Sequence, residues 1–214
     1  YVVFGKSGGF TSAINLSTLN GTNGFRLDGV GATDSSGQSV SSAGDINGDS
    51  FDDLVVGVPG DSPSFASIVF GKSSGFASAI SLSGLTGTNG FQITDGTGGF
   101  RFGHAVSSAG DVNGDGYGDV VVGAPLLSSY GGAYVYHGSS AGLSASPNWQ
   151  FVSFSANSRF GISVACAGDV NGDGFSDVLM GQSRYQIGAV YAGAVSCYYG
   201  SPTGLNTLYP EWFV

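Results

Sequence analysis

Apolar residues in this chain come in short runs separated by segments rich in glycine and serine, and no helical period is sustained. Within one stretch, four such runs occupy residues 104–110, 119–123, 132–138 and 148–152. Each run alternates apolar and polar positions or stays apolar for a few residues, and each is rich in valine or aromatic residues, as β-strands require. The pattern predicts four short strands joined by turns.

The four-strand pattern recurs along the chain. Residues 4–25 reappear as 70–91, and residues 41–59 reappear as 107–125, both at an offset of 66, and a third copy of the second segment occupies 165–183. A period of roughly 60 residues with four strands in each period is typical of the blades of a β-propeller. The predicted fold class is therefore all-β, with antiparallel four-stranded blades. A solenoid of β-units is the alternative.

The repeat divides the chain into parts of one propeller segment, residues 1–214. The predicted parts are the outer strands of a partial blade at 1–28 and complete blades at 30–95, 100–153 and 158–214. Because closed propellers contain four or more blades, we expect an open segment or part of a larger ring. Its two ends would expose unpaired strand edges.

Composition narrows the class of protein. The chain has 39 glycines in 214 residues and only 10% charged residues, which disfavours long helices. A net charge of −9 makes nucleic acid a poor partner, and no apolar stretch is long enough to predict membrane insertion. The chain opens without methionine or a secretory signal, and two cysteines make no disulfide framework.

Nine of the fifteen acidic residues stand at positions 1, 5 and 9 of three short loops, which read D-I-N-G-D-S-F-D-D, D-V-N-G-D-G-Y-G-D and D-V-N-G-D-G-F-S-D. Oxygen-bearing side chains occupy positions 1, 3, 5 and 9 of each loop, and the aromatic residue at position 7 can offer its backbone carbonyl. The candidate metal ligands are Asp45, Asn47, Asp49, Phe51 and Asp53 in the first loop, Asp111, Asn113, Asp115, Tyr117 and Asp119 in the second, and Asp169, Asn171, Asp173, Phe175 and Asp177 in the third.

Five hard oxygen ligands with three carboxylates suit Ca²⁺, whereas zinc or copper would prefer histidine or cysteine. We therefore expect about three Ca²⁺ sites. An EF-hand is excluded because it needs a glutamate at position 12, where these loops have Val56, Val122 and Met180. A dockerin-type loop leads into a helix, whereas these loops lead into valine-rich strands. The remaining alternative is a turn rich in Asx residues without metal.

The second repeat resembles the FG-GAP family, which builds the integrin α-subunit propeller and occurs in bacterial extracellular proteins. Its residues include Phe102-Gly103, the loop from Asp111 to Asp119, and Gly123-Ala124-Pro125. The third repeat keeps Phe160-Gly161 but ends in Gly-Gln-Ser, and the first has Ser36-Gly37 in place of Phe-Gly. The resemblance covers essentially the whole chain. It implies a propeller with strand one innermost and Ca²⁺ between strands one and two.

Three functions follow as hypotheses. The first is a calcium-stabilised, non-catalytic module for adhesion or recognition at an extracellular or cell-surface location, with an unknown protein or glycan ligand. The second is a structural subunit that self-associates through its open blade edges into a fibre or surface layer. The third, an enzyme acting on a polysaccharide, is least favoured because the two histidines and the single glutamate form no catalytic constellation. Asn15 and Asn20 lie in glycosylation sequons whose use stays open.

Overall fold

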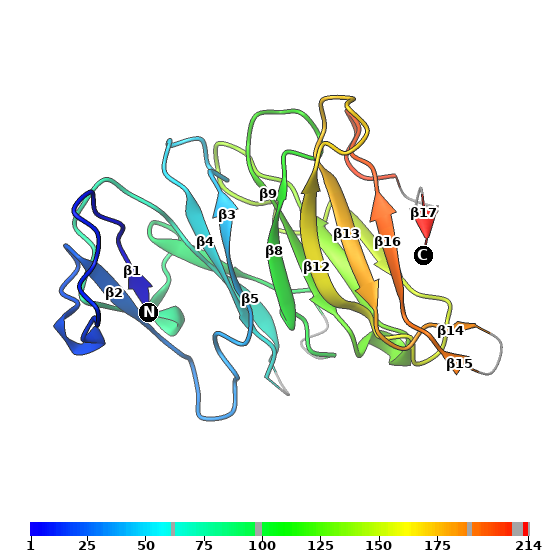
Figure 1. The fold of residues 1–214 in the computed structure, drawn as a ribbon, viewed down its shortest axis with the longest axis horizontal. Coiled ribbons are helices and arrows are strands. Elements are labelled where there is room, and N and C mark those ends of the chain that lie inside the picture. The colour runs from blue at the N-terminus through cyan, green and yellow to red at the C-terminus, as the bar shows by residue number, and fades with distance from the viewer. Residues whose placement is uncertain (61–62, 97–99, 188–189, 207–211, 214) are drawn as a thin grey trace.

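The computed structural model describes residues 1–60, 63–96, 100–187, 190–206 and 212–213. Within these residues the only helices are three short 3-10 turns, η1 (Leu16–Thr18), η2 (Leu82–Gly84) and η3 (Leu127–Ser129). Three four-stranded antiparallel sheets follow one another across the molecule (Figure 1). The predicted all-β fold with four-stranded blades is confirmed, and the described residues form no closed ring.

Each four-stranded sheet is built from one continuous stretch of chain. The first contains β3 (Val40–Gly44), β4 (Asp53–Val58), β5 (Phe65–Val69) and β7 (Gly90–Ile93). The second contains β8 (Ala105–Gly110), β9 (Asp119–Ala124), β10 (Gly132–Tyr136) and β11 (Trp149–Val152). The third contains β12 (Phe160–Gly168), β13 (Asp177–Gln182), β16 (Ala194–Tyr198) and β17 (Trp212–Phe213). Parts of the predicted 30–95 and 158–214 segments lie outside the described residues.

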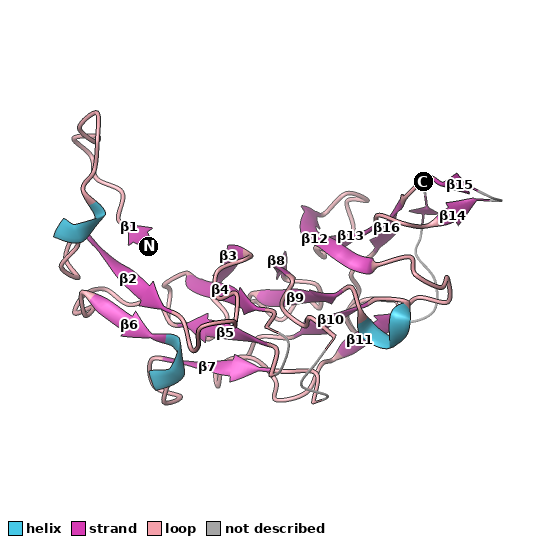
Figure 2. Ribbon diagram, turned by 90° about the horizontal axis from the view of Figure 1, so that it is seen from below, coloured by secondary structure: helices cyan, strands magenta, loops and turns pink. Residues whose placement is uncertain are grey.

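Two smaller sheets were not predicted as such. In the first, β1 (Val2–Val3) pairs with β2 (Gly24–Asp28), and β6 (Ala79–Ser81) joins β2 in parallel. The second is a two-stranded hairpin of β14 (Gln186–Ile187) and β15 (Val190–Tyr191). The parallel strand ties the N-terminal segment to the first complete sheet (Figure 2).

The core lies between the sheets, because alternate residues of each strand face opposite neighbours. In β9, Val120 and Val122 pack in one cluster with Val55 and Ile68 of the first sheet. The residue between them, Val121, packs in a second cluster with Val178, Met180 and other residues of the third sheet. A strand buried on both faces therefore reads as a continuous valine run.

The FG and GAP motifs meet across the sheet interface. A Cβ added to Gly123, the glycine of the GAP triplet, would lie 2.0 Å from the carbonyl oxygen of Gly161, which belongs to the FG pair of the next sheet. Gly57 and Gly103 make the same approach one interface earlier, also at 2.0 Å. The neighbouring Phe102 and Phe160 are fully buried. The two motifs thus allow close backbone contact between successive sheets.

Candidate metal centre

The three acidic loops occupy equivalent places in the three sheets. Each connects the first strand to the second, and all three hairpins point to the same edge of the molecule, uppermost in Figure 1. The register of each strand pair shifts just before the loop, at Ser42/Gly44, Ser108/Gly110 and Cys166/Gly168. Such bulges bend a strand and redirect the following residues, so they set the angle at which each loop leaves its sheet.

The aspartate at position 1 closes the loop on itself. In the second loop, Asp111 Oδ1 accepts hydrogen bonds from the N–H groups of Gly114 (2.7 Å) and Asp115 (3.1 Å). Its Oδ2 accepts from Gly116 N–H at 2.8 Å. Asp45 and Asp169 make the corresponding three bonds in the other loops, and those from Gly174, Gly172 and Asp173 lower the pKa of Asp169.

The side chains at positions 3 and 5 meet each other. Asn113 Nδ2 donates to Asp115 Oδ2 at 2.8 Å, while Asn113 Oδ1 accepts from Asp115 N–H at 3.1 Å. Asp115 Oδ1 in turn accepts from Tyr117 N–H at 3.0 Å. The Asn47–Asp49 and Asn171–Asp173 pairs repeat this arrangement. Positions 1, 3, 5 and the backbone of position 7 therefore belong to one tight turn.

The aspartate at position 9 is the first residue of the second strand and is fully buried in all three loops. Asp119 accepts hydrogen bonds from Val112 N–H (2.8 Å) at position 2 and from Gly138 N–H (2.9 Å) beyond the third strand. Asp53 and Asp177 bond in the same way to Ile46 and Gly71, and to Val170 and Gly200. This residue ties the loop to two strands of its own sheet.

Burial of these carboxylates is electrostatically unfavourable. Desolvation raises the pKa of Asp119 to about 7, and the negative charges of Asp115 and Asp111 act in the same direction. For Asp53, burial with a smaller contribution from Asp49 and Asp45 raises the pKa to about 6. Among the described residues the single ion pair is Arg26–Asp28, far along the chain from these acids. A bound cation would offset both the desolvation of these carboxylates and the repulsion between them.

The donor set fits a hard divalent cation, since each loop offers three carboxylates, one amide oxygen and backbone carbonyls. The side chains are not drawn together on a single point, however. Within the described part of the chain, no three Asp, Glu, His or Cys side chains converge closely enough to hold a metal ion as they stand. The position-1 carboxylates are instead engaged by backbone amides.

Contacts between each loop and the next sheet were missed by the sequence analysis. The backbone carbonyl of Asp45 accepts from Gly118 N–H at 2.8 Å, and that of Asp111 accepts from Ser176 N–H at 2.9 Å. The ring of Tyr117 also lies against Gly48, whose Cβ would be 2.7 Å from the Tyr117 Cε1 atom. Position 8 and the position-7 ring therefore connect the second loop to the first and the third loop to the second. The repeated aromatic residue at position 7 was the signal available in the sequence.

The remaining polar candidates lie elsewhere. Cys166 on β12 and Cys197 on β16 form no disulfide, and β13 lies between their strands. His104 lies before β8, and His137 contacts the second loop through its Nδ1 atom, 3.3 Å from Asn113 Nδ2. Burial lowers the pKa of both histidines.

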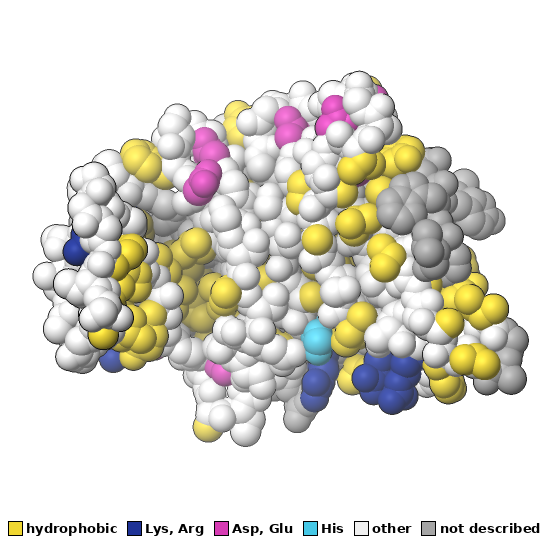
Figure 3. Space-filling view, viewed as in Figure 1, with side chains coloured by type: hydrophobic (Ala, Val, Ile, Leu, Met, Phe, Trp, Pro, Cys, Tyr) yellow, Lys and Arg dark blue, Asp and Glu magenta, His cyan; other side chains and the backbone are white. Residues whose placement is uncertain are grey.

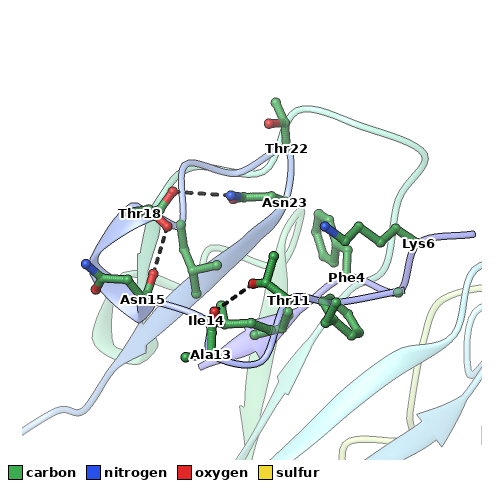
Figure 4. Close-up of a pocket in the computed structure, with 13 residues that line it drawn as sticks. Phe4, Lys6, Thr11, Ala13, Ile14, Asn15, Thr18, Thr22 and Asn23 are labelled. Carbon is green, nitrogen blue, oxygen red and sulfur yellow. Dashed lines mark hydrogen bonds between the residues drawn. The ribbon is translucent and has the colours of Figure 1, made fainter. Parts of the chain in front are cut away.

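A separate cavity of about 400 Å³ lies in the N-terminal segment (Figure 4). Thr18 Oγ1 donates to the Asn15 carbonyl oxygen at 2.7 Å, and Asn23 Nδ2 donates to the Thr18 carbonyl at 3.2 Å, so these polar groups already serve the loop backbone. Oδ1 of each sequon asparagine, Asn15 and Asn20, accepts from its own sequon hydroxyl. Glycosylation stays a prediction.

The repeats match known families. The FG-GAP repeat family matches residues 36–80, and the FG-GAP-like repeat matches residues 111–180. The chain is an FG-GAP repeat protein. It is 31% identical to integrin alpha-V of Gallus gallus over 167 residues, which cover 69% of this chain and 15% of that relative. It is also 31% identical to integrin alpha-6 of Gallus gallus over 161 residues, 72% of this chain and 14% of that relative.

A shorter match reaches 43% identity with integrin alpha-E of Mus musculus, over 91 residues that cover 38% of this chain. These matches span 15% or less of the length of each relative, so the FG-GAP chain corresponds to an integrin-like module within much longer proteins. No helix in the described residues has the length and apolar character needed to span a membrane.

Proposed function

We propose that this FG-GAP chain is a calcium-stabilised, non-catalytic module for adhesion or recognition that works outside the cell or at its surface. In each of the three hairpins, the position-1, 3, 5 and 9 side chains and the position-7 carbonyl would ligate one Ca²⁺. The ion would supply charge neutralisation and would fix the loop. The chain's own residues already fix the start of the second strand and the link to the next sheet.

One observation carries this proposal. The same turn, with the same hydrogen bonds from positions 1, 3, 5 and 9, occurs three times at one edge of the molecule, and two of its copies bond to the following loop. A turn that served only to reverse the chain would not need three unneutralised carboxylates in each copy. Sites of this kind outside the cell often bind Ca²⁺ in the millimolar range, which supports an extracellular setting.

Isothermal titration calorimetry on chelator-treated chain tests the proposal. We expect about three Ca²⁺ ions per chain, with Mg²⁺ binding more weakly because it demands smaller, near-ideal octahedral geometry. Absence of calcium binding at millimolar concentration would contradict the proposal, and so would a single ion per chain.

Self-association is a second candidate function, favoured by the third loop. Ile46 and Val112, at position 2 of the first two loops, are fully buried under the following sheet, whereas the equivalent Val170 is 52% exposed. That face could receive another blade, from a second copy or from a longer chain. Light scattering across a range of concentrations distinguishes these cases. A mass that stays monomeric at every concentration would exclude assembly of this chain into fibres or layers.

A further inference from the structure

Basic side chains collect on the edge of the molecule opposite the acidic loops. The chain has only six lysines and arginines. Arg101 and Arg159 immediately precede the FG pairs, before β8 and at the start of β12, and Arg184 follows the end of β13. The acidic loops leave the other ends of these strands. In Figure 3 acidic side chains lie mostly along the upper edge, and basic side chains gather below the sheets.

The loops that hold these arginines form one hydrogen-bonded surface, here called the arginine rim: residues 100–101, 126–130, 157–159 and Arg184. Leu126 N–H donates to the Phe100 carbonyl at 3.3 Å, and Asn157 N–H donates to the Ser129 carbonyl at 2.8 Å. Arg184 N–H donates to the Ser158 carbonyl at 3.0 Å. These hydrogen bonds fix the positions of loops from two successive sheets relative to each other.

The rim also concentrates unusual backbone conformations. Arg101 and Arg159 occupy the same repeat position and have φ values of 58° and 57°, in the left-handed region that favours glycine. Phe100, Ser128, Ser129 and Asn157, all on the rim, have positive φ as well. Strained residues of this kind cluster at ligand-binding sites. Arginine at a position where glycine would be less strained points to a use for its side chain.

The rim arginines are available to a ligand. Within the described residues the only ion pair is Arg26–Asp28, so the guanidinium groups of Arg101, Arg159 and Arg184 have no carboxylate partner there. Arg101 and Arg184 are exposed and Arg159 is half-buried. Beside them, the Phe100 side chain is 45% exposed and that of Tyr130 is 37% exposed. Burial lowers the pKa of His104, and the positive charges of Arg101 and Arg159 lower it further.

We propose that the arginine rim binds an acidic polysaccharide, with Arg101 and Arg159 each contacting one anionic group and neighbouring aromatic rings contacting the sugar faces. The proposal rests on the recognition role proposed above and names its ligand class. Guanidinium groups bind carboxylates and sulfates through paired, charge-assisted hydrogen bonds.

A polysaccharide fits better than an acidic peptide because of the repeat. Arg101 and Arg159 stand one blade apart at the same position, so a linear polymer with regularly spaced anions would meet them in succession. Exposed Phe100 and Tyr130 add rings of the kind that contact sugars.

The test measures the affinity of the calcium-loaded chain for three probes: a heparin-derived octasaccharide, an oligogalacturonate of similar length and neutral maltooctaose. The key variant is Arg101→Gly/Arg159→Gly, because glycine suits the positive φ and preserves the backbone. Arg101→Lys/Arg159→Lys retains the charge but loses the planar donor pair. The matched control is Lys6→Gln/Lys72→Gln, which removes the same charge near Phe10 and Phe76, away from the rim.

We expect one or both acidic probes to bind, and the arginine-to-glycine variant to weaken binding by about tenfold for each arginine removed. The lysine variant should recover part of the affinity, and the control should bind like the original chain. The proposal is overturned if neither acidic probe binds, if maltooctaose binds equally well, if the glycine variant keeps its affinity, or if the control loses as much. Calcium titration of each variant keeps failure of this proposal distinct from failure of the metal sites.

Discussion

The buried aspartate at position 9 is the residue on which each hairpin depends most. Asp119 joins the N–H groups of Val112 and Gly138, and so links the loop with two strands. Its burial and the repulsion from Asp111 and Asp115 raise its pKa to about 7. A group in this position helps hold the backbone together and at the same time carries an electrostatic cost that a divalent cation would offset.

Asparagine at position 5 should weaken one calcium site without disturbing the fold. Asp49 is exposed, and Asp49→Asn keeps an acceptor for Phe51 N–H while removing a charge. We expect the calorimetric stoichiometry to fall by one ion per chain, or the affinity of that site to fall by about tenfold or more. The matched control is Asp52→Asn, since Asp52 is an exposed acid in the same loop at a non-ligand position. Equal effects of the two changes would contradict the ligand assignment.

His104 should make the calcium-loaded chain less stable in mild acid. Burial, then the charges of Arg101 and Arg159, lower its pKa below the ordinary 6.5. The unfolded chain therefore takes up this proton at higher pH than the folded chain does. The stability contribution is complete above 6.5 and falls as pH drops through the folded-state pKa.

Urea unfolding between about pH 7 and pH 5 checks this sign. The variant His104→Gln introduces glutamine, which the first repeat has at the equivalent position, Gln38. This variant should reduce the loss of stability across that range. A variant whose pH profile equals that of the original chain would contradict the role given to His104.

At the scale of elements, the blade interface depends on backbone contact as well as on side-chain packing. The GAP glycine of one sheet meets the FG glycine of the next, while valines of β9 fill the cores on both sides. Since protein interiors are close-packed, an added methyl group at such a contact must displace backbone.

Replacing Gly123 with alanine should force the second and third sheets apart. Its Cβ would lie 2.0 Å from the Gly161 carbonyl oxygen, so we expect Gly123→Ala to lower the free energy of unfolding by about 1–3 kcal/mol or more. Gly8→Ala serves as the control because nothing lies within 4 Å of the added Cβ and its φ is not positive. Denaturant unfolding measures both. A Gly123→Ala chain as stable as the control would contradict this account of the motif.

Calcium should also protect amides that cross between sheets. Gly118 N–H bonds to the Asp45 carbonyl and Ser176 N–H to the Asp111 carbonyl, so fixing each acidic loop should slow hydrogen exchange at the sheet that follows. Thr18 N–H, which bonds to the Asn15 carbonyl in the N-terminal segment, is the control amide. Faster or unchanged exchange at Gly118 and Ser176 on adding Ca²⁺ would show that the loops do not couple the sheets.

The strands were predictable because each is short, valine-rich or aromatic, and repeated. Runs at 119–123 and 148–152 closely match β9 and β11. Strand β6 was not predictable in the same way, since its three residues pair in parallel with β2 of the N-terminal segment, whereas the strands before and after it in the sequence pair with each other, and it carries no distinctive pattern. The pairing of β14 with β15 likewise occurs at a place without a repeat partner.

The candidate metal ligands could be predicted from their spacing in the sequence alone. The hydrogen bonds that connect one acidic loop to the next sheet could not. Sequence spacing places Asp45, Asn47 and Asp49 in one turn, and the hydrogen bonds agree. It gives no information on the bond from Gly118 to the Asp45 carbonyl, which joins residues 73 positions apart in different sheets. The arginine rim was missed for the same reason, because it arises where separate loops meet.

At the scale of the whole molecule, charge is divided between two edges. Acidic loops lie on one edge and the arginine rim on the other (Figure 3). Three bound Ca²⁺ ions would change the formal charge from −9 to −3, which would reduce repulsion both within the chain and toward an acidic ligand. Metal binding and ligand recognition would then support each other from opposite ends of the same strands.

The most direct test of the central claim, that calcium in the three hairpins stabilises the stacked sheets, is differential scanning calorimetry in Ca²⁺ and in EDTA. Each site contributes about 2.7 kcal/mol at hundredfold excess over its Kd, and 1 kcal/mol shifts Tm by about 2–4 °C in a chain of this size. We expect Ca²⁺ to raise Tm by more than about 10 °C, and the Asp49→Asn/Asp115→Asn/Asp173→Asn variant to lose most of that rise. The same Tm with and without Ca²⁺ would contradict the account.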